Sequence, residues 1–117
     1  MKVFRMENES GNGPYAAEWD FARPVDLDDM VSHHNRSRPK AHQDGIKFGT
    51  AMWDVHTRFG MESLDRLRWW FSGYLDLLQS HGFNVITCEV PEGHYRVGTS
   101  GQVAFDHQAA IYREKQE

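Results

Sequence analysis

The stretch FGMESLDRLRWWFSGYLDLLQSHGFNVITCEVP, residues 59–91 of a 117-residue chain, decides the fold. It predicts one helix at about residues 63–81 and a strand at residues 83–90. In the helical part, apolar side chains recur at the three- and four-residue spacing that places them on one face. The members of this apolar face are Leu64, Leu67, Phe71, Tyr74, Leu75 and Leu78. We expect this face to cover one side of a β-sheet.

Both ends of the predicted helix carry local signals. The Ser63 hydroxyl can accept a hydrogen bond from an N–H group of the first turn, and Asp65 adds negative charge at the positive end of the helix dipole. Gly82 suits the left-handed conformation that ends many helices. Gly73 lies in the middle, where a glycine costs about 1 kcal/mol, so the helix either bends there or divides into two pieces.

Short β-prone segments lie on both sides of this unit. Residues 52–59 alternate between apolar and polar side chains, as in a strand with one buried face. Residues 2–6 are β-prone, and residues 95–97 and 102–105 flank the turn sequence GTSG, which predicts a hairpin. The sequence therefore predicts an α+β fold, with a mainly antiparallel sheet of about five short strands covered by one main amphipathic helix.

The chain reads as a single domain over residues 1–117, because its length suffices for one core and not for two. A short helical turn is expected at residues 26–33. The segment 33–45 has no apolar period and contains Pro39, which predicts either a functional loop or a disordered segment. From about residue 113 we expect a polar tail that frays.

Composition narrows the functional classes. A formal charge of −4 repels phosphate at long range, which disfavours direct nucleic-acid binding. One cysteine, Cys88, excludes an internal disulfide and is expected to be a small core side chain. No apolar run approaches the ~20 residues that span a bilayer, and the start MKVFRMENES lacks the apolar core of a signal peptide. We expect a cytoplasmic protein without direct membrane contact.

Seven histidines, among them His33, His34 and His42, raise the question of a metal site. Zinc needs about four ligands at fixed geometry, and neither a cysteine pair nor an HExxH motif is present. We interpret the histidines as part of a solvated polar loop and expect no metal. Motifs for nucleophilic catalysis, for phosphate-binding loops and for dinucleotide turns are also absent.

Trp69 falls on the polar face of the predicted helix, opposite the apolar face. Either another part of the chain covers this indole or it contacts a partner, since tryptophan is enriched among interface hot spots. Acidic residues share its helix, and basic residues follow in the 33–45 segment. The basic run more often only keeps a loop soluble. The candidate partner-binding residues are Trp69, Asp65, Asp76, Arg36, Arg38 and Lys40.

Three blocks of the chain resemble small proteins of tailed phages and prophages. They are KVFRMENESGNGPY at residues 2–15, FGMESLDRLRWWF at residues 59–71 and VITCEVPEGHYRVGTSGQVAF at residues 85–105. The resemblance implies interference with a host process, as anti-CRISPR and other anti-defence inhibitors do. On this hypothesis the protein binds a host protein or nucleoprotein complex in the host cytoplasm, without a cofactor. A virion structural or assembly protein is a further alternative.

The chain also resembles the ADP-ribosyltransferase-like fold, in which a first-strand arginine contacts NAD and a late strand carries a catalytic glutamate. Arg5, Tyr15, the 59–63 motif and Gln102 follow in the matching order. Gln102 stands where that family has its acid, and an amide stabilises a developing oxocarbenium ion poorly compared with a carboxylate. The resemblance therefore implies either an NAD-dependent enzyme that uses Glu89 instead or a non-catalytic relative.

Overall fold

The computed structural model describes residues 1–15, 27–40, 43–46, 57–111 and 113–115. In these residues the fold is α+β, with one antiparallel sheet and short helices, which confirms the predicted class. The sheet has six strands, one more than expected, in the order β4-β5-β2-β1-β3-β6. The strands are β1 (Lys2–Glu7), β2 (Thr57–Met61), β3 (Asn84–Glu89), β4 (Tyr95–Val97), β5 (Gln102–Asp106) and β6 (Arg113–Lys115).

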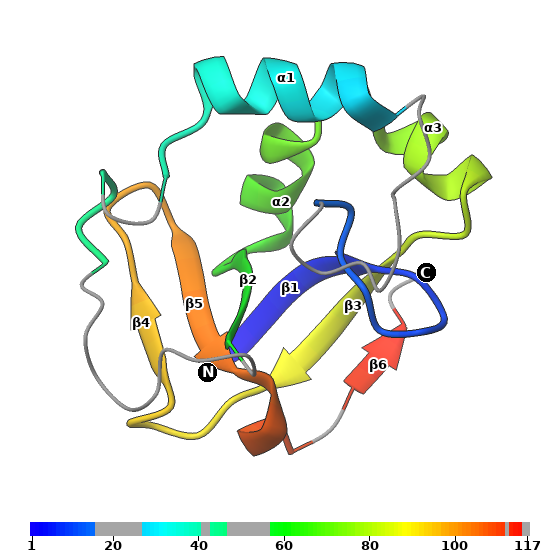
Figure 1. Cartoon of the computed structure of the whole chain (residues 1–117). Coiled ribbons are helices and arrows are strands. Elements are labelled where there is room, and N and C mark those ends of the chain that lie inside the picture. Colours follow the sequence, from blue (N-terminus) through cyan, green and yellow to red (C-terminus); the bar gives the residue numbers. More distant parts are fainter. Residues whose placement is uncertain (16–26, 41–42, 47–56, 112, 116–117) are drawn as a thin grey trace.

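The helices lie together at one end of the sheet, with α1 across the C-terminal end of α2 (Figure 1). A short 3-10 turn follows β5 at the other end of that strand. The helical elements are α1 (Asp28–Ser37), α2 (Leu64–Trp70), α3 (Leu75–Ser80) and the 3-10 turn η3 (His107–Ala109). Among the described residues, no helix has the length and apolar character needed to cross a membrane.

The helix expected at 63–81 is divided into α2 and α3. Gly73 takes φ = 88° in the connection, a left-handed conformation that interrupts a right-handed helix. The predicted ends are confirmed, since the Ser63 hydroxyl accepts a hydrogen bond from the Arg66 N–H at 3.1 Å and Gly82 has φ = 84°. The glycine divides the helix into two pieces, which is one of the two outcomes that its position allowed.

Two groups of buried side chains pack on opposite sides of the sheet. On the side that the helices cover, side chains of strands, helices and their connections pack together: Met6, Leu27, Met30, Met61, Leu67, Trp70, Phe71, Leu78 and Phe83. On the other side lie Val3, Cys88, Val90, Val103 and Phe105. Cys88 is fully buried, as expected of a small core side chain. The apolar face of α2 and α3 therefore covers one side of the sheet.

Two expectations for irregular segments are wrong. Helix α1 continues through Ser37, so residues 33–37 of the expected loop are helical, because buried His34 extends the packed face begun by Met30 one turn earlier. Residues 113–115 do not fray but pair with β3 as β6, which satisfies backbone groups along that edge. The strand expected at residues 52–59 lies outside the described residues up to residue 56, and β2 covers the remainder.

Strands β1 and β2 approach each other closely at Gly60. A Cβ atom built there would lie 2.6 Å from Val3 Cγ1 and 2.7 Å from the Phe4 carbonyl oxygen. Only glycine fits such a contact. This close approach brings the end of β2 and the start of α2 over the middle of β1, where the candidate site lies.

Candidate ligand-binding site

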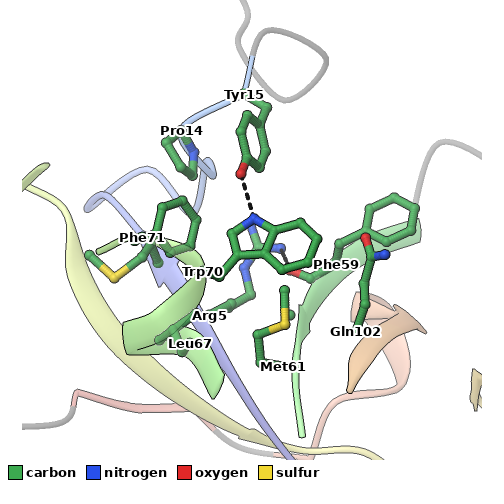
Figure 2. A pocket seen from close by; sticks show the side chains of 11 residues that line it. Arg5, Pro14, Tyr15, Phe59, Met61, Leu67, Trp70, Phe71 and Gln102 are labelled. Atoms are coloured by element: carbon green, nitrogen blue, oxygen red, sulfur yellow. Dashed lines mark hydrogen bonds between the residues drawn. The ribbon is translucent and has the colours of Figure 1, made fainter. Parts of the chain in front are cut away.

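A cavity lies between the ends of β1, β2 and β5 and the inner side of α2 (Figure 2). We call it the Arg5 pocket; its walls include Arg5, Tyr15, Phe59, Met61, Trp70 and Gln102. Four of these side chains, Arg5, Tyr15, Phe59 and Gln102, belong to the segments singled out by the ADP-ribosyltransferase resemblance. The fold thus brings together residues that are far apart in the sequence, in a cavity with mostly apolar walls.

Arg5 is held rigidly in the wall of this pocket. Its side chain is 2% exposed, and its Nε lies 2.7 Å from Glu7 Oε2, two residues along the same face of β1. Its NH1 group donates to the Phe59 carbonyl oxygen of β2 at 2.9 Å. The guanidinium is therefore fixed by both strands, and its position does not depend on a ligand.

Three aromatic side chains form a hydrogen-bonded series beside the pocket. Trp70 Nε1 donates to the Tyr15 hydroxyl at 2.7 Å (Figure 2), and the same hydroxyl lies 2.7 Å from His34 Nδ1. Because an indole N–H only donates, the Tyr15 oxygen accepts from Trp70 and its proton is available for His34. In the tautomer in which Tyr15 donates to His34 Nδ1, the imidazole proton lies on Nε2. We call this series the Trp70–Tyr15–His34 relay.

The surroundings of His34 favour its neutral form. The ring is buried against Tyr15, Phe71 and Tyr74, with ring centroids 5.5–5.9 Å away. Burial, the nearby Arg38 charge and His33 lower the His34 pKa from 6.5 to about 4. At neutral pH the imidazole is therefore uncharged.

The turn before β5 is tied to a buried carboxylate from the segment that follows Lys40. Asp44 Oδ1 accepts from the Thr99 hydroxyl at 2.8 Å and from the Ser100 N–H at 2.7 Å, and Oδ2 accepts from the Ser100 hydroxyl at 2.6 Å. Burial alone would raise the pKa of Asp44, but these bonds and one from Gln102 bring it below its usual value. The Asp44 carboxylate therefore stays charged and fixes the turn.

Gln102 occupies the first position of β5, beside that carboxylate. Its Nε2 also lies 3.4 Å from the Pro39 carbonyl oxygen, so the amide N–H groups point to Pro39 and Asp44, and its carbonyl oxygen is the end left to accept. A glutamate at this position would place a second negative charge against Asp44. The amide at residue 102 therefore matches its surroundings.

None of the described residues that line the Arg5 pocket is an aspartate or a glutamate. Glu89, the alternative acid, lies elsewhere: its Oε1 pairs with the N-terminal amino group at 3.0 Å. Glu7 and Glu89 stand at opposite ends of the β1–β3 pair and do not share a cleft.

A second cavity adjoins the first. We call it the Lys40 pocket; its walls are His34, Asn35, Arg38, Pro39 and Lys40, together with Tyr15 and Trp70. Since Tyr15 and Trp70 line both cavities, the Trp70–Tyr15–His34 relay is the wall between them. The sequence pattern points to no role for Trp70 and predicts a solvated loop around His34. The sequence offers one signal for the role of Trp70: a buried indole needs a hydrogen-bond acceptor for its N–H group.

Trp69 lies on the outer surface next to this region. Its side chain is 44% exposed, with the Cζ atoms of Arg38 and Arg66 4.3 and 4.4 Å from its ring centroid. Arg38 also donates to the Trp69 and Trp70 carbonyl oxygens, at 3.2 and 3.1 Å. Arg38 therefore contacts Trp69 directly, and it shares the wall of the Lys40 pocket with Lys40.

The other candidate partner-binding residues are exposed but separate. Asp65 lies on α2, Asp76 on α3 and Arg36 on α1, and in the described part of the chain none of them has a recorded contact with Trp69. For metal binding, the described residues contain no group of three or more histidine, cysteine or acidic side chains that would hold an ion. His42 lies outside them.

The family model described as bacteriophage T4 Y00F protein matches residues 1–117, and the chain belongs to that family. The predicted kinship with phage proteins is confirmed at this level. Its anti-defence role and its likeness to ADP-ribosyltransferases stay predictions. Neither the curated proteins nor the solved structures contain a match to this chain.

Proposed function

We propose that this member of the T4 Y00F family binds NAD in the Arg5 pocket. On this proposal it is a relative of ADP-ribosyltransferases that still binds NAD but no longer cleaves it efficiently. One observation carries the proposal: Arg5, Tyr15, Phe59 and Gln102, which the resemblance selects by their order in the sequence, line a single cavity. Protein of this kind would act in the host cytoplasm on a host nucleotide.

The chemistry of the walls suits a planar, positively charged ring such as nicotinamide. Phe59 and Trp70 provide aromatic faces, which attract cations and stack on flat rings. Gln102 offers an amide oxygen that can accept from a ribose hydroxyl. Arg5 is fixed in the wall with its charge balanced by Glu7, so its side chain offers N–H donors to the ligand and no net charge.

Turnover is expected to be slow because no acid is in place. Cleavage of the bond between nicotinamide and ribose builds positive charge on the sugar, which a nearby carboxylate stabilises and an amide does not. The described walls of the Arg5 pocket contain no carboxylate, and Asp44 disfavours one at residue 102. We expect NAD to be bound and released largely intact.

Calorimetric titration with NAD tests this proposal. Arg5→Ala is a poor probe, since it would break the buried Arg5–Glu7 ion pair and cost roughly 3–5 kcal/mol of stability. Phe59→Ala is cleaner, because the side chain is 37% exposed at the pocket wall. It should weaken NAD binding about tenfold, a loss of about 1.4 kcal/mol. Val97→Ala, a similarly exposed strand residue outside both pockets, should change nothing.

If millimolar NAD gives no heat of binding with the wild-type protein, the proposal is refuted. Equal weakening by Phe59→Ala and Val97→Ala would also count against it, because the effect would then not come from the Arg5 pocket. Products analysed after overnight incubation should contain little free nicotinamide, whereas rapid release would show that the protein turns NAD over.

A second candidate function is inhibition of a host defence complex, in the manner of anti-CRISPR proteins, through protein binding. The observation that favours it is the exposed Trp69 indole between two guanidinium groups. Exposed tryptophan and arginine are the residues most enriched in interface hot spots. The exposed acidic side chains Asp65 on α2 and Asp76 on α3 would complement a basic, nucleic-acid-handling surface.

Affinity capture from a host lysate, with quantification of each captured protein, tests this candidate. Trp69→Ala should reduce capture of the true partner at least tenfold, as expected for a hot-spot residue, while the melting temperature stays nearly constant. Ile111→Ala is the matched control, since Ile111 is 70% exposed and distant in sequence from α2. Identical capture by wild type and Trp69→Ala would exclude the indole as the contact.

A further inference from the structure

We propose that the Lys40 pocket is a phosphate site, and that it holds the pyrophosphate of a dinucleotide whose nicotinamide end lies in the Arg5 pocket. This inference rests on the proposed function. The two cavities share Tyr15 and Trp70 and therefore lie side by side, as a ligand that occupies both requires. The Lys40 pocket is the larger, about 140 Å³ against about 40 Å³. The bulky tetrahedral groups therefore fit it better than the Arg5 pocket.

The charges in the walls favour an anion. Arg38 and Lys40 both line the Lys40 pocket, and its described walls contain no acidic residue. Arg38 donates to two backbone carbonyl oxygens and to the Ser37 hydroxyl, none of which neutralises its charge. In the described part of the chain, neither Arg38 nor Lys40 forms an ion pair with a carboxylate. Two cations with no neutralising charge at one cavity attract phosphate strongly.

The adjacent helix end does not cancel this attraction. The C-terminus of α1 carries partial negative charge, which by itself would repel an anion. Its last carbonyl groups are in part satisfied, because the Arg38 N–H donates to the His34 oxygen and the Ser37 hydroxyl donates to the His33 oxygen. Two full positive charges outweigh the remaining half charge.

His34 adds an independent observation. Its side chain is 4% exposed and lines the Lys40 pocket, and its Nε2 has no hydrogen-bond partner among the described residues. In the tautomer in which Tyr15 donates to Nδ1, that nitrogen carries the proton, and a buried donor without an acceptor costs about 1–3 kcal/mol. A phosphate oxygen entering from the pocket would satisfy it. A neutral imidazole donor, two cations and the Asn35 amide together provide the donor set that phosphate needs.

Two variants leave the folded framework intact. Lys40→Gln removes one charge from an exposed side chain, and Asn35→Asp adds a negative charge at an exposed position of α1 in the same wall. Their matched controls are Lys2→Gln on β1 and Gln79→Glu on α3, which make the same charge changes outside both pockets. Calorimetry with NAD, nicotinamide riboside and inorganic pyrophosphate, at low and high salt, then separates the two pockets.

The expected result is that NAD binds about 5–10-fold more weakly to Lys40→Gln and weaker still to Asn35→Asp, with less dependence on salt, while both controls behave as wild type. Nicotinamide riboside, which has no phosphate, should bind wild type and Lys40→Gln alike. If NAD binds both equally, the phosphate site is refuted and the proposed function stands. If pyrophosphate binds and Lys40→Gln abolishes it while NAD and the riboside show no binding, the phosphate site stands and the proposed function fails. Absence of binding by all three ligands refutes both.

Discussion

Acidification should destabilise the protein through His34. The unfolded chain takes up a proton on this imidazole near pH 6.5, whereas in the folded protein burial, Arg38 and His33 lower the pKa to about 4. Between these two values the unfolded state binds more protons than the folded state. The stabilisation is therefore complete above pH 6.5 and is lost as the pH falls towards 4.

The size of the effect follows from the two pKa values. Their separation, 6.5 against about 4, corresponds to about 3 kcal/mol in the limit of low pH, and about 2 kcal/mol of this is lost by pH 5. For a domain of this size, such a loss lowers the melting temperature by roughly 8 °C. Asp44 does not contribute in this range, because its lowered pKa confines its loss of stability to pH values below its usual 3.8.

Urea denaturation of wild type and His34→Gln at pH 7.5 and pH 5 measures this linkage, and the difference between the two pH dependences isolates His34 from the other histidines. Glutamine keeps a polar side chain and does not titrate. Direct observation of the His34 ring signals by NMR gives the pKa itself. A measured value near 6.5, or the same pH dependence in both proteins, would refute a neutral, buried His34 in the relay.

Two further predictions concern residues around the Arg5 pocket. Gln102→Glu should lower the free energy of unfolding at pH 7 by roughly 2–4 kcal/mol, because the new carboxylate faces Asp44 in a buried site. Adding Asp44→Asn to the same chain should restore part of the lost stability. A thermal melt of Gln102→Glu that matches wild type would contradict this prediction. Gly60→Ala should lower the free energy of unfolding by about 1–3 kcal/mol, since the new Cβ would meet Val3 Cγ1 and the Phe4 carbonyl oxygen at 2.6 and 2.7 Å. An unchanged urea midpoint would show that β1 and β2 can move apart.

Local signals made part of the fold predictable. The Ser63 cap and the left-handed Gly82 depend only on neighbouring residues, and both lie where the sequence indicates. The extension of α1 to Ser37 was not predictable, because it depends on His34 packing against Phe71 and Tyr74, in the connection between α2 and α3. The pairing of β6 with β3 is likewise tertiary, since nothing within residues 113–115 shows which edge they join.

For the candidate site, the boundary between what was and was not predictable is similar. Arg5, Tyr15 and Gln102 came from the order of motifs in a resemblance, and the structure places them in one cavity. Trp70 and His34 were missed because their roles depend on a single hydroxyl, that of Tyr15, which is 55 residues from Trp70 and 19 from His34. Periodicity places a tryptophan on a face and says nothing of the oxygen that accepts from its N–H.

The most direct test of the central claim is a titration with NAD followed through methionine methyl signals in NMR. Met6 and Met61 line the Arg5 pocket, whereas Met1 and Met30 do not. We expect the Met6 and Met61 signals to shift and saturate with increasing NAD while those of Met1 and Met30 stay in place. Signals of Met6 and Met61 that remain unmoved at millimolar NAD would contradict the account.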